Sequence, residues 1–108
     1  MSNKSILLGV FGSTPQLRLV DFFLDNPRFD FTRGEIVAAL GMAKRTLARH
    51  LPELLDSGVV EVSRKMGRAE LYRLNSDSDV VVGLRKLEDS LASRVDVVAE
   101  PPQAIVVD

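Results

Sequence analysis

The sequence predicts a mostly α-helical fold that contains one β-hairpin, an α+β class. From residue 14 to residue 57, apolar residues recur three or four positions apart in three segments, the spacing of one helix face. From residue 60 to residue 74 the period falls to two, the spacing of a β-strand, on both sides of Gly67. A helical period returns after residue 76. The sequence therefore predicts three helices, a hairpin and a fourth helix.

The composition fits one domain. The chain has 108 residues, of which 45% are hydrophobic and 27% charged, and these values are typical of a packed domain. It has no cysteine and a single histidine, His50, so thiolate and multi-histidine metal sites within one chain are excluded. We predict neither a metal nor a cofactor. The longest apolar run, residues 6–11, is far shorter than the ~18–20 residues of a membrane span, so we expect a cytoplasmic protein that makes no membrane contact.

The first predicted helix follows an apolar N-terminal arm, residues 1–13. It begins at Thr14 and Pro15, because threonine caps helices and proline suits the first helical position. Dense apolar residues place this helix at the centre of the core. Asn26 and Pro27 end it.

The next two predicted helices are joined by a short turn. Thr32 and Glu35 form a capping box that starts the first of them, and Gly41 ends it. The following helix occupies residues 43–57, with leucines recurring along one face. Such a pair of helices, followed by a hairpin, has the element order of a winged helix-turn-helix, which we expect over residues 14–75.

The predicted hairpin has Gly67 in its turn. If Tyr72 and Leu74 face the core, strict alternation places Leu71 and Arg73 on the outer face.

An additional amphipathic helix is predicted over residues 76–98, followed by a tail over residues 99–108. Its expected apolar stripe consists of Val80, Leu84, Leu87, Leu91 and Val95.

Charge is unevenly distributed along the chain. The net charge is −1, but residues 32–74 contain eight basic and five acidic residues, whereas residues 75–108 contain three basic and seven acidic residues. A polyanionic partner responds to the local field rather than to the total charge. The positive middle segment is therefore compatible with DNA, which the net charge alone would disfavour.

Two basic clusters form the candidate DNA site. On a helical projection of residues 43–57, Arg45 and Arg49 lie opposite the leucine face, where a guanidinium can bind the guanine edge in the major groove. The second cluster surrounds the hairpin turn, residues 64–68, where it would contact the DNA backbone or minor groove. The predicted DNA-contacting residues are Lys44, Arg45, Thr46, Arg49, His50, Arg64, Lys65 and Arg68.

Three alternatives bear on this prediction. Any single arginine on a helix is more often a solvated surface charge, and only the combination of the two clusters favours double-stranded DNA. A winged helix used for protein–protein contact without DNA binding is the alternative function, which the acidic C-terminal third keeps open. An enzyme is disfavoured because the sequence has no phosphate loop, nucleophile–base pair or metal cluster.

Residues 32–75, and more loosely 12–91, resemble the small single-domain winged-helix transcriptional regulators of the ArsR/MarR-like group from archaea and bacteria. The resemblance rests on FGSTPQLRLVDFFLDNP and FTRGEIVAALGMAKRTLARHLPELLDSGVVEVSRKMGRAELYRLN. It implies that residues 43–57 read the major groove, that residues 64–68 are the wing, and that the protein acts as a dimer. Position 43 is alanine, where this group commonly has a serine or threonine cap, and the cysteines of the metal-sensing members are absent, so metalloid sensing is not implied.

A homodimer is expected through the C-terminal helix, with or without residues 6–11, because symmetric dimers read paired half-sites. The alternative is that this helix packs only on its own domain.

Overall fold

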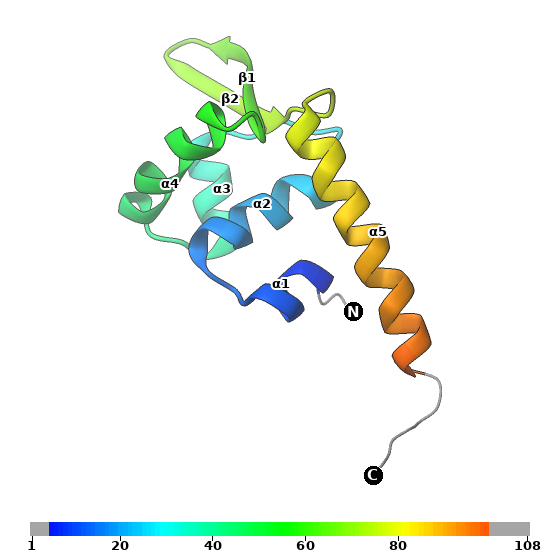
Figure 1. Cartoon of the computed structure of the whole chain (residues 1–108). Coiled ribbons are helices and arrows are strands. Elements are labelled where there is room, and N and C mark those ends of the chain that lie inside the picture. Colours follow the sequence, from blue (N-terminus) through cyan, green and yellow to red (C-terminus); the bar gives the residue numbers. More distant parts are fainter. Residues whose placement is uncertain (1–4, 100–108) are drawn as a thin grey trace.

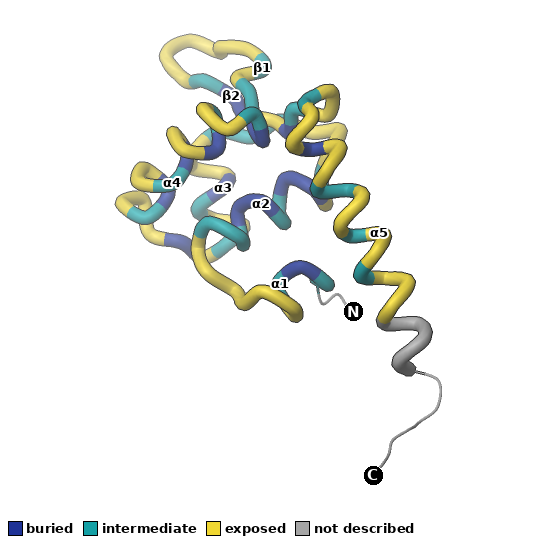
Figure 2. Tube along the Cα trace, in the orientation of Figure 1, coloured by how far each residue is buried: buried dark blue, intermediate teal, exposed yellow. Residues whose placement is uncertain are grey.

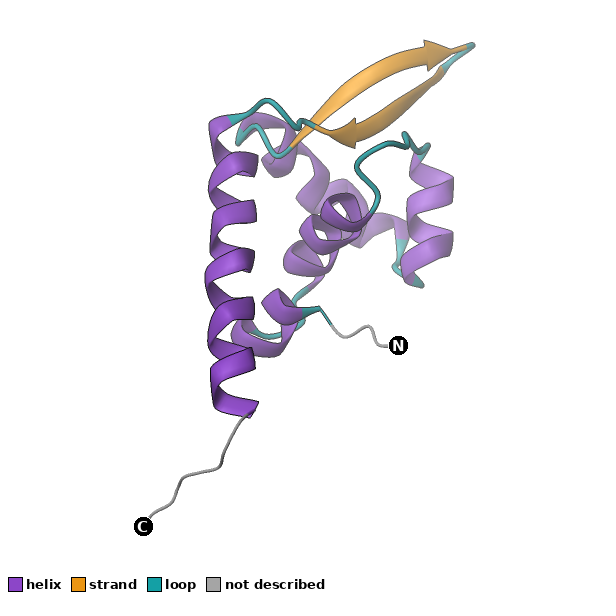
Figure 3. Cartoon of the chain, turned by 90° about the vertical axis from the view of Figure 1, so that its right-hand side faces the viewer, coloured by secondary structure: helices purple, strands orange, loops and turns teal. Residues whose placement is uncertain are grey.

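The computed structural model describes residues 5–99, with side chains through residue 94. Its elements are α1 (Ile6–Phe11), α2 (Pro15–Asp25), α3 (Arg33–Leu40), α4 (Lys44–Asp56), β1 (Val60–Met66), β2 (Ala69–Leu74) and α5 (Asp79–Ala99). The hairpin projects from a helical body, and α5 runs along one side of that body (Figures 1 and 3). The predicted α+β class is confirmed. Nearly all of the predicted tail lies outside the described residues.

The helix ends follow the predicted capping signals. The Thr14 hydroxyl accepts a hydrogen bond from the Leu17 amide at 3.2 Å. The capping box is complete, because the Glu35 amide donates to the Thr32 hydroxyl and the Thr32 amide donates to the Glu35 carboxylate. Gly41 adopts the left-handed conformation, with φ 61°, which glycine tolerates at a helix C-terminus. Gly41 therefore ends α3 and begins the short turn that leads to α4.

The hairpin is a pair of antiparallel strands joined by a two-residue turn at Gly67 and Arg68. A bulge interrupts the register between Val62 and Arg64, so that strict alternation fails beside it. Leu71 and Tyr72 are both buried, although they are neighbours in β2. Tyr72 and Leu74 belong to the core cluster and Leu71 does not. Leu71 pairs with Arg64 across the hairpin, and directly opposed residues share a face, so Leu71 lies on the predicted outer face but is buried there.

The base of the hairpin is also attached to the segment before α3. The amide of Phe31 donates to the Tyr72 carbonyl oxygen, and the amide of Tyr72 donates to the Phe31 carbonyl oxygen, each at 2.8 Å. This isolated bridge adds a third short extended segment beside β2. It fixes the position of the wing relative to the start of α3.

The core lies between α2, α3, α4 and the base of the hairpin (Figure 2). Its fully buried side chains include Leu19, Phe23, Ile36 and Leu51. Residues outside the predicted winged-helix segment contribute to it as well: Leu7 of α1 and Val81 of α5 are buried in the same cluster. The apolar arm predicted at the N-terminus thus contains a short helix that packs on α2 and α5.

The buried face of α5 differs from the predicted stripe. Val81 is buried and Leu84 and Leu91 pack against the core, whereas Val80 and Leu87 are exposed. The inward face also carries Arg85, whose guanidinium donates to the Leu24 carbonyl oxygen at 2.9 Å. The stripe predicted from apolar residues alone is therefore rotated about the helix axis relative to the face that α5 buries against the core.

The side chain of Val95, the last member of the predicted stripe, is outside the described residues. Within residues 5–99, none of the helices combines the length and apolarity needed to cross a bilayer.

Candidate nucleic-acid interface

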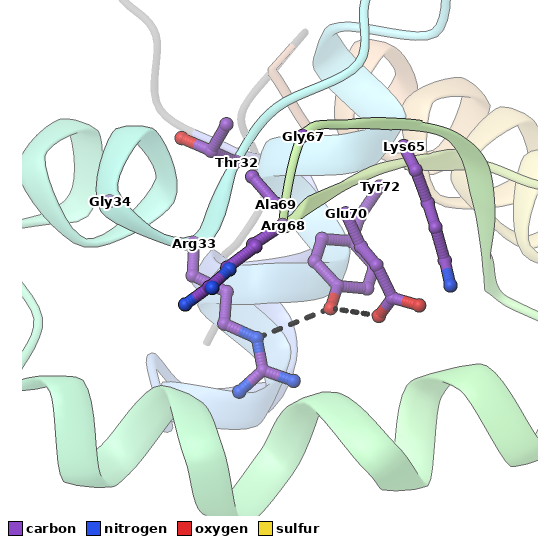
Figure 4. Close-up of a pocket in the computed structure, with 9 residues that line it drawn as sticks. All are labelled: Thr32, Arg33, Gly34, Lys65, Gly67, Arg68, Ala69, Glu70 and Tyr72. Carbon is purple, nitrogen blue, oxygen red and sulfur yellow. Dashed lines mark hydrogen bonds between the residues drawn. The ribbon is translucent and has the colours of Figure 1, made fainter.

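A cavity of about 570 Å³ opens between the wing and the first turn of α3 (Figure 4). Three cationic side chains line it, Arg33 from α3 and Lys65 and Arg68 from the hairpin. Glu70 and Tyr72 of β2 form part of its wall. The hairpin therefore presents its positive charge toward α3 and not only toward solvent.

A second cavity, of about 410 Å³, lies between α3 and α4. Lys44 lines it at the start of α4, and Arg33 and Gly34 line it from α3. Because Arg33 and Gly34 also line the first cavity, the two cavities adjoin. We call this combined depression the basic groove and define its cations as Arg33, Lys44, Lys65 and Arg68.

Arg33 is held at the middle of the basic groove. Its Nε donates to the Tyr72 hydroxyl at 3.2 Å, and its guanidinium carbon lies 5.7 Å from the centroid of the Tyr72 ring. The Tyr72 hydroxyl donates in turn to the Glu70 carboxylate at 3.0 Å. Figure 4 shows the three side chains in this chain of hydrogen bonds, between β2 and α3.

The outer face of α4 carries the two arginines predicted to read bases. Arg45 and Arg49 are exposed, while Leu47, Leu51 and Leu54 on the opposite side are buried. The predicted division of the helix into an apolar and a cationic face is therefore confirmed. Ala43 precedes the helix without a side-chain cap, as expected from its identity.

Thr46 and His50 flank that face and are half-buried. His50 Nδ1 lies 3.3 Å from Glu53 Oε1, which also accepts a hydrogen bond from the Gln16 side chain at 3.1 Å. This contact orients the imidazole ring along the edge of α4.

Most of the candidate cations form no ion pair within the described residues. Among the residues whose side chains are described, no carboxylate lies within 4.0 Å of the charged nitrogens of the cations of the basic groove or of Arg45 and Arg49. Uncompensated cations on adjoining elements produce a positive local field. A positive field of this kind attracts a polyanion.

Arg64 is the exception among the predicted wing residues. Its guanidinium donates two hydrogen bonds to Asp30, at 2.9 and 3.2 Å. Together with the Ser63 hydroxyl, it holds the pKa of the Asp30 carboxyl below its ordinary value, and Asp30 raises the pKa of Arg64. Neighbouring strand residues point to opposite faces, so Lys65 lines the basic groove while Arg64 holds the other face of the wing to the segment before α3.

Sequence reasoning missed Arg33 as a site residue. A signal was present, because Arg33 is the first residue of α3, and a cation there is opposed by the helix dipole by ~0.3–1 kcal/mol. A residue placed against that preference is a candidate for function. No comparable signal identified Tyr72, whose spacing indicates only a core position.

Within the described part of the chain, His, Asp and Glu side chains do not gather in groups of three or more that could hold a metal ion.

Comparison with solved structures supports the fold. The ferric uptake regulator from Francisella tularensis with iron superposes with a TM-score of 0.52 at 17% identity, over 61% of this chain and 54% of that one. This chain thus spans about half of that regulator's length. Reduced HlyU from Vibrio cholerae superposes with a TM-score of 0.56 at 26% identity, over 80% of this chain and 84% of that one. The chain has the winged helix-turn-helix fold that these proteins share. It matches no family model and no curated relative.

Proposed function

We propose that this chain is a DNA-binding transcriptional regulator that binds double-stranded DNA through α4 and the wing. The observation that carries the proposal is the basic groove, which adjoins the cationic outer face of α4 and whose four cations form no ion pair with a described carboxylate. The fold shared with a ferric uptake regulator is consistent with a regulatory role.

In this proposal the two cationic surfaces have different tasks. Residues 43–57 enter the major groove, where Arg45 and Arg49 bind guanine edges and Thr46 and His50 contact bases or phosphates beside them. Lys44, Lys65 and Arg68 bind phosphates, with the wing, residues 64–68, over the backbone or minor groove. Arg64 stabilises the wing through Asp30 and adds charge at its outer face.

Selection of bound duplexes from a random library tests the proposal. A regulator of this kind enriches a short motif, because each bidentate arginine–guanine contact discriminates by ~1–3 kcal/mol. Recovery of a random pool, with no enriched motif after repeated rounds, would contradict sequence-specific binding.

A protein–protein module is the second candidate function. Two exposed apolar residues of β1, Val62 and Met66, and the exposed Phe29 between α2 and α3 favour it. Exposed apolar side chains on a projecting hairpin are suited to contact with another protein. The same selection separates the two functions, since a protein-binding module enriches no duplex.

We further propose that the active form is a symmetric homodimer involving α5 and α1. Val81, Leu84 and Leu91 pack α5 on its own domain, but Leu87 remains 37% exposed, and Val10 and Phe11 of α1 are exposed as well. Because α1 and α5 contact each other, these residues offer a second copy a surface built from both helices.

Leu87→Arg is expected to convert the dimer to a monomer, because a buried unpaired charge opposes association strongly. Sedimentation equilibrium measures the mass. Val82→Arg is the matched control, since Val82 is also exposed on α5 but lies ~140° around the helix from Leu87. An unchanged mass for Leu87→Arg would contradict dimerisation through this face.

A further inference from the structure

We infer that Arg33 clamps a DNA backbone phosphate in the basic groove, and that Tyr72 and Glu70 are the positioning residues that hold it there. The inference rests on the proposed DNA-binding function. It adds a DNA contact that lies outside both the predicted recognition helix, residues 43–57, and the wing, residues 64–68. It follows from three features: the location of Arg33, the buried hydroxyl that binds it, and the charge around it.

The location of Arg33 is central. It contributes to the wall of both adjoining cavities, between the wing cations on one side and Lys44 on the other. A phosphodiester strand crossing from α4 to the wing would pass this point. A single small anion would need only one of the cavities, so the distribution of cations over both favours a polyanion with regularly spaced charges.

The Tyr72 hydroxyl fixes the direction of the guanidinium. Tyr72 is 1% exposed, so its ring cannot turn to another partner. Its single proton is donated to Glu70, and its oxygen is therefore free to accept from Arg33 Nε. This leaves the two terminal nitrogens of Arg33 for the groove (Figure 4), a fork that matches phosphate oxygens.

Glu70 has a second effect on the groove. Glu70 is half-buried in a cavity whose other charged side chains are all cations. It is also the cross-strand partner of Lys65. Its carboxylate keeps the Tyr72 proton in place, and it also repels an incoming phosphate. Glu70 therefore orders Arg33 and at the same time limits the affinity for DNA.

Arg33→Ala tests the clamp. In a fluorescence-anisotropy titration with a labelled duplex, we expect affinity to fall about 5- to 10-fold, and the slope of log K against log salt to fall in magnitude by ~1, because one phosphate contact is lost. Base preference should not change. Arg28→Ala, an exposed arginine that does not line the groove, should leave the slope as in the wild type.

Tyr72→Phe tests the positioning role through a double-mutant cycle. We expect this variant to weaken duplex binding about 3-fold when Arg33 is present and to have no further effect in an Arg33→Ala background, since residues that act through one another are non-additive. A thermal melt of each variant gives the temperature range in which it is folded, and binding is measured within that range. Equal effects of Tyr72→Phe in both backgrounds would overturn the positioning role.

Glu70→Gln keeps a hydrogen-bond acceptor for Tyr72 and removes the charge. Duplex binding should tighten about 3- to 10-fold at ~0.1 M salt, because a repulsive charge near the phosphate is lost. Glu61→Gln, at the base of the hairpin and paired with Arg73 at 2.8 Å, should have a smaller effect. Unchanged or weaker binding by Glu70→Gln would overturn its role.

The outcomes also separate this inference from the function on which it rests. If the wild type binds duplexes with base preference but Arg33→Ala keeps the full salt slope, the clamp alone is wrong. If the wild type binds no duplex, both the proposed function and the clamp are wrong.

Discussion

Replacing Arg45 and Arg49 together by alanine is expected to weaken binding to the preferred duplex by about 2–6 kcal/mol, which is about 30-fold or more, and to remove most of the base preference. Both side chains lie on the exposed face of α4, opposite the buried leucines. Their loss removes the only two guanidinium groups of that helix. Binding to an unrelated duplex should weaken much less, by the loss of charge alone.

Competition between preferred and unrelated duplexes measures this effect. The matched control is the double variant Arg28→Ala and Arg94→Ala, which removes two exposed arginines from other parts of the fold. Its base preference should equal that of the wild type. If the Arg45 and Arg49 variant retained the wild-type preference, α4 would not be the reading helix.

Phe23→Ala is expected to lower the free energy of unfolding by about 3–5 kcal/mol, because a large buried ring leaves a cavity. Phe23 is 0% exposed, and its ring centroid lies 5.4 Å from that of Phe22 and 6.2 Å from that of Phe31. Phe31 carries the bridge to β2. Loss of the Phe23 ring therefore also weakens the support of the wing.

Urea denaturation followed by circular dichroism gives this free energy. Phe29→Ala supplies the matched control, since Phe29 is 62% exposed and surface substitutions usually change stability by less than ~0.5 kcal/mol. Equal destabilisation by the two variants would contradict the described core.

The elements whose boundaries depend on local signals could be predicted from the sequence. Thr14, the capping box of Thr32 and Glu35, and Gly41 each satisfy backbone groups within their own turn. Their chemistry is therefore visible in a few adjacent residues. The cationic face of α4 was equally predictable, because it depends only on the helical period.

Features that depend on contacts between distant segments could not be predicted. Leu71 is buried although it pairs with Arg64 on the face of the hairpin away from the core cluster. The inward face of α5 includes Arg85 because its partner is a carbonyl oxygen of α2, and apolarity alone gives no indication of this. The directions in which the wing cations point could not be predicted either. Arg64 and Lys65 are adjacent in sequence but lie on opposite faces of the hairpin.

The basic groove is the clearest example. Arg33 and Tyr72 are separated by 39 positions in sequence, and the bridge between Phe31 and Tyr72 helps to bring the start of α3 beside β2. When each helix and strand is considered alone, Arg33 is assigned to the surface and Tyr72 to the core. Their joint role becomes visible only when α3 and β2 are side by side.

The central claim is that a positive surface of α3, α4 and the wing binds DNA phosphates. The salt dependence of duplex binding tests this claim most directly. With four cations in the basic groove, the slope of log K against log salt should be about −3 to −4 per subunit. Replacing Lys44, Lys65 and Arg68 together by glutamine should bring it close to about −1. A wild-type slope near zero, or the same slope in the triple variant, would contradict the claim.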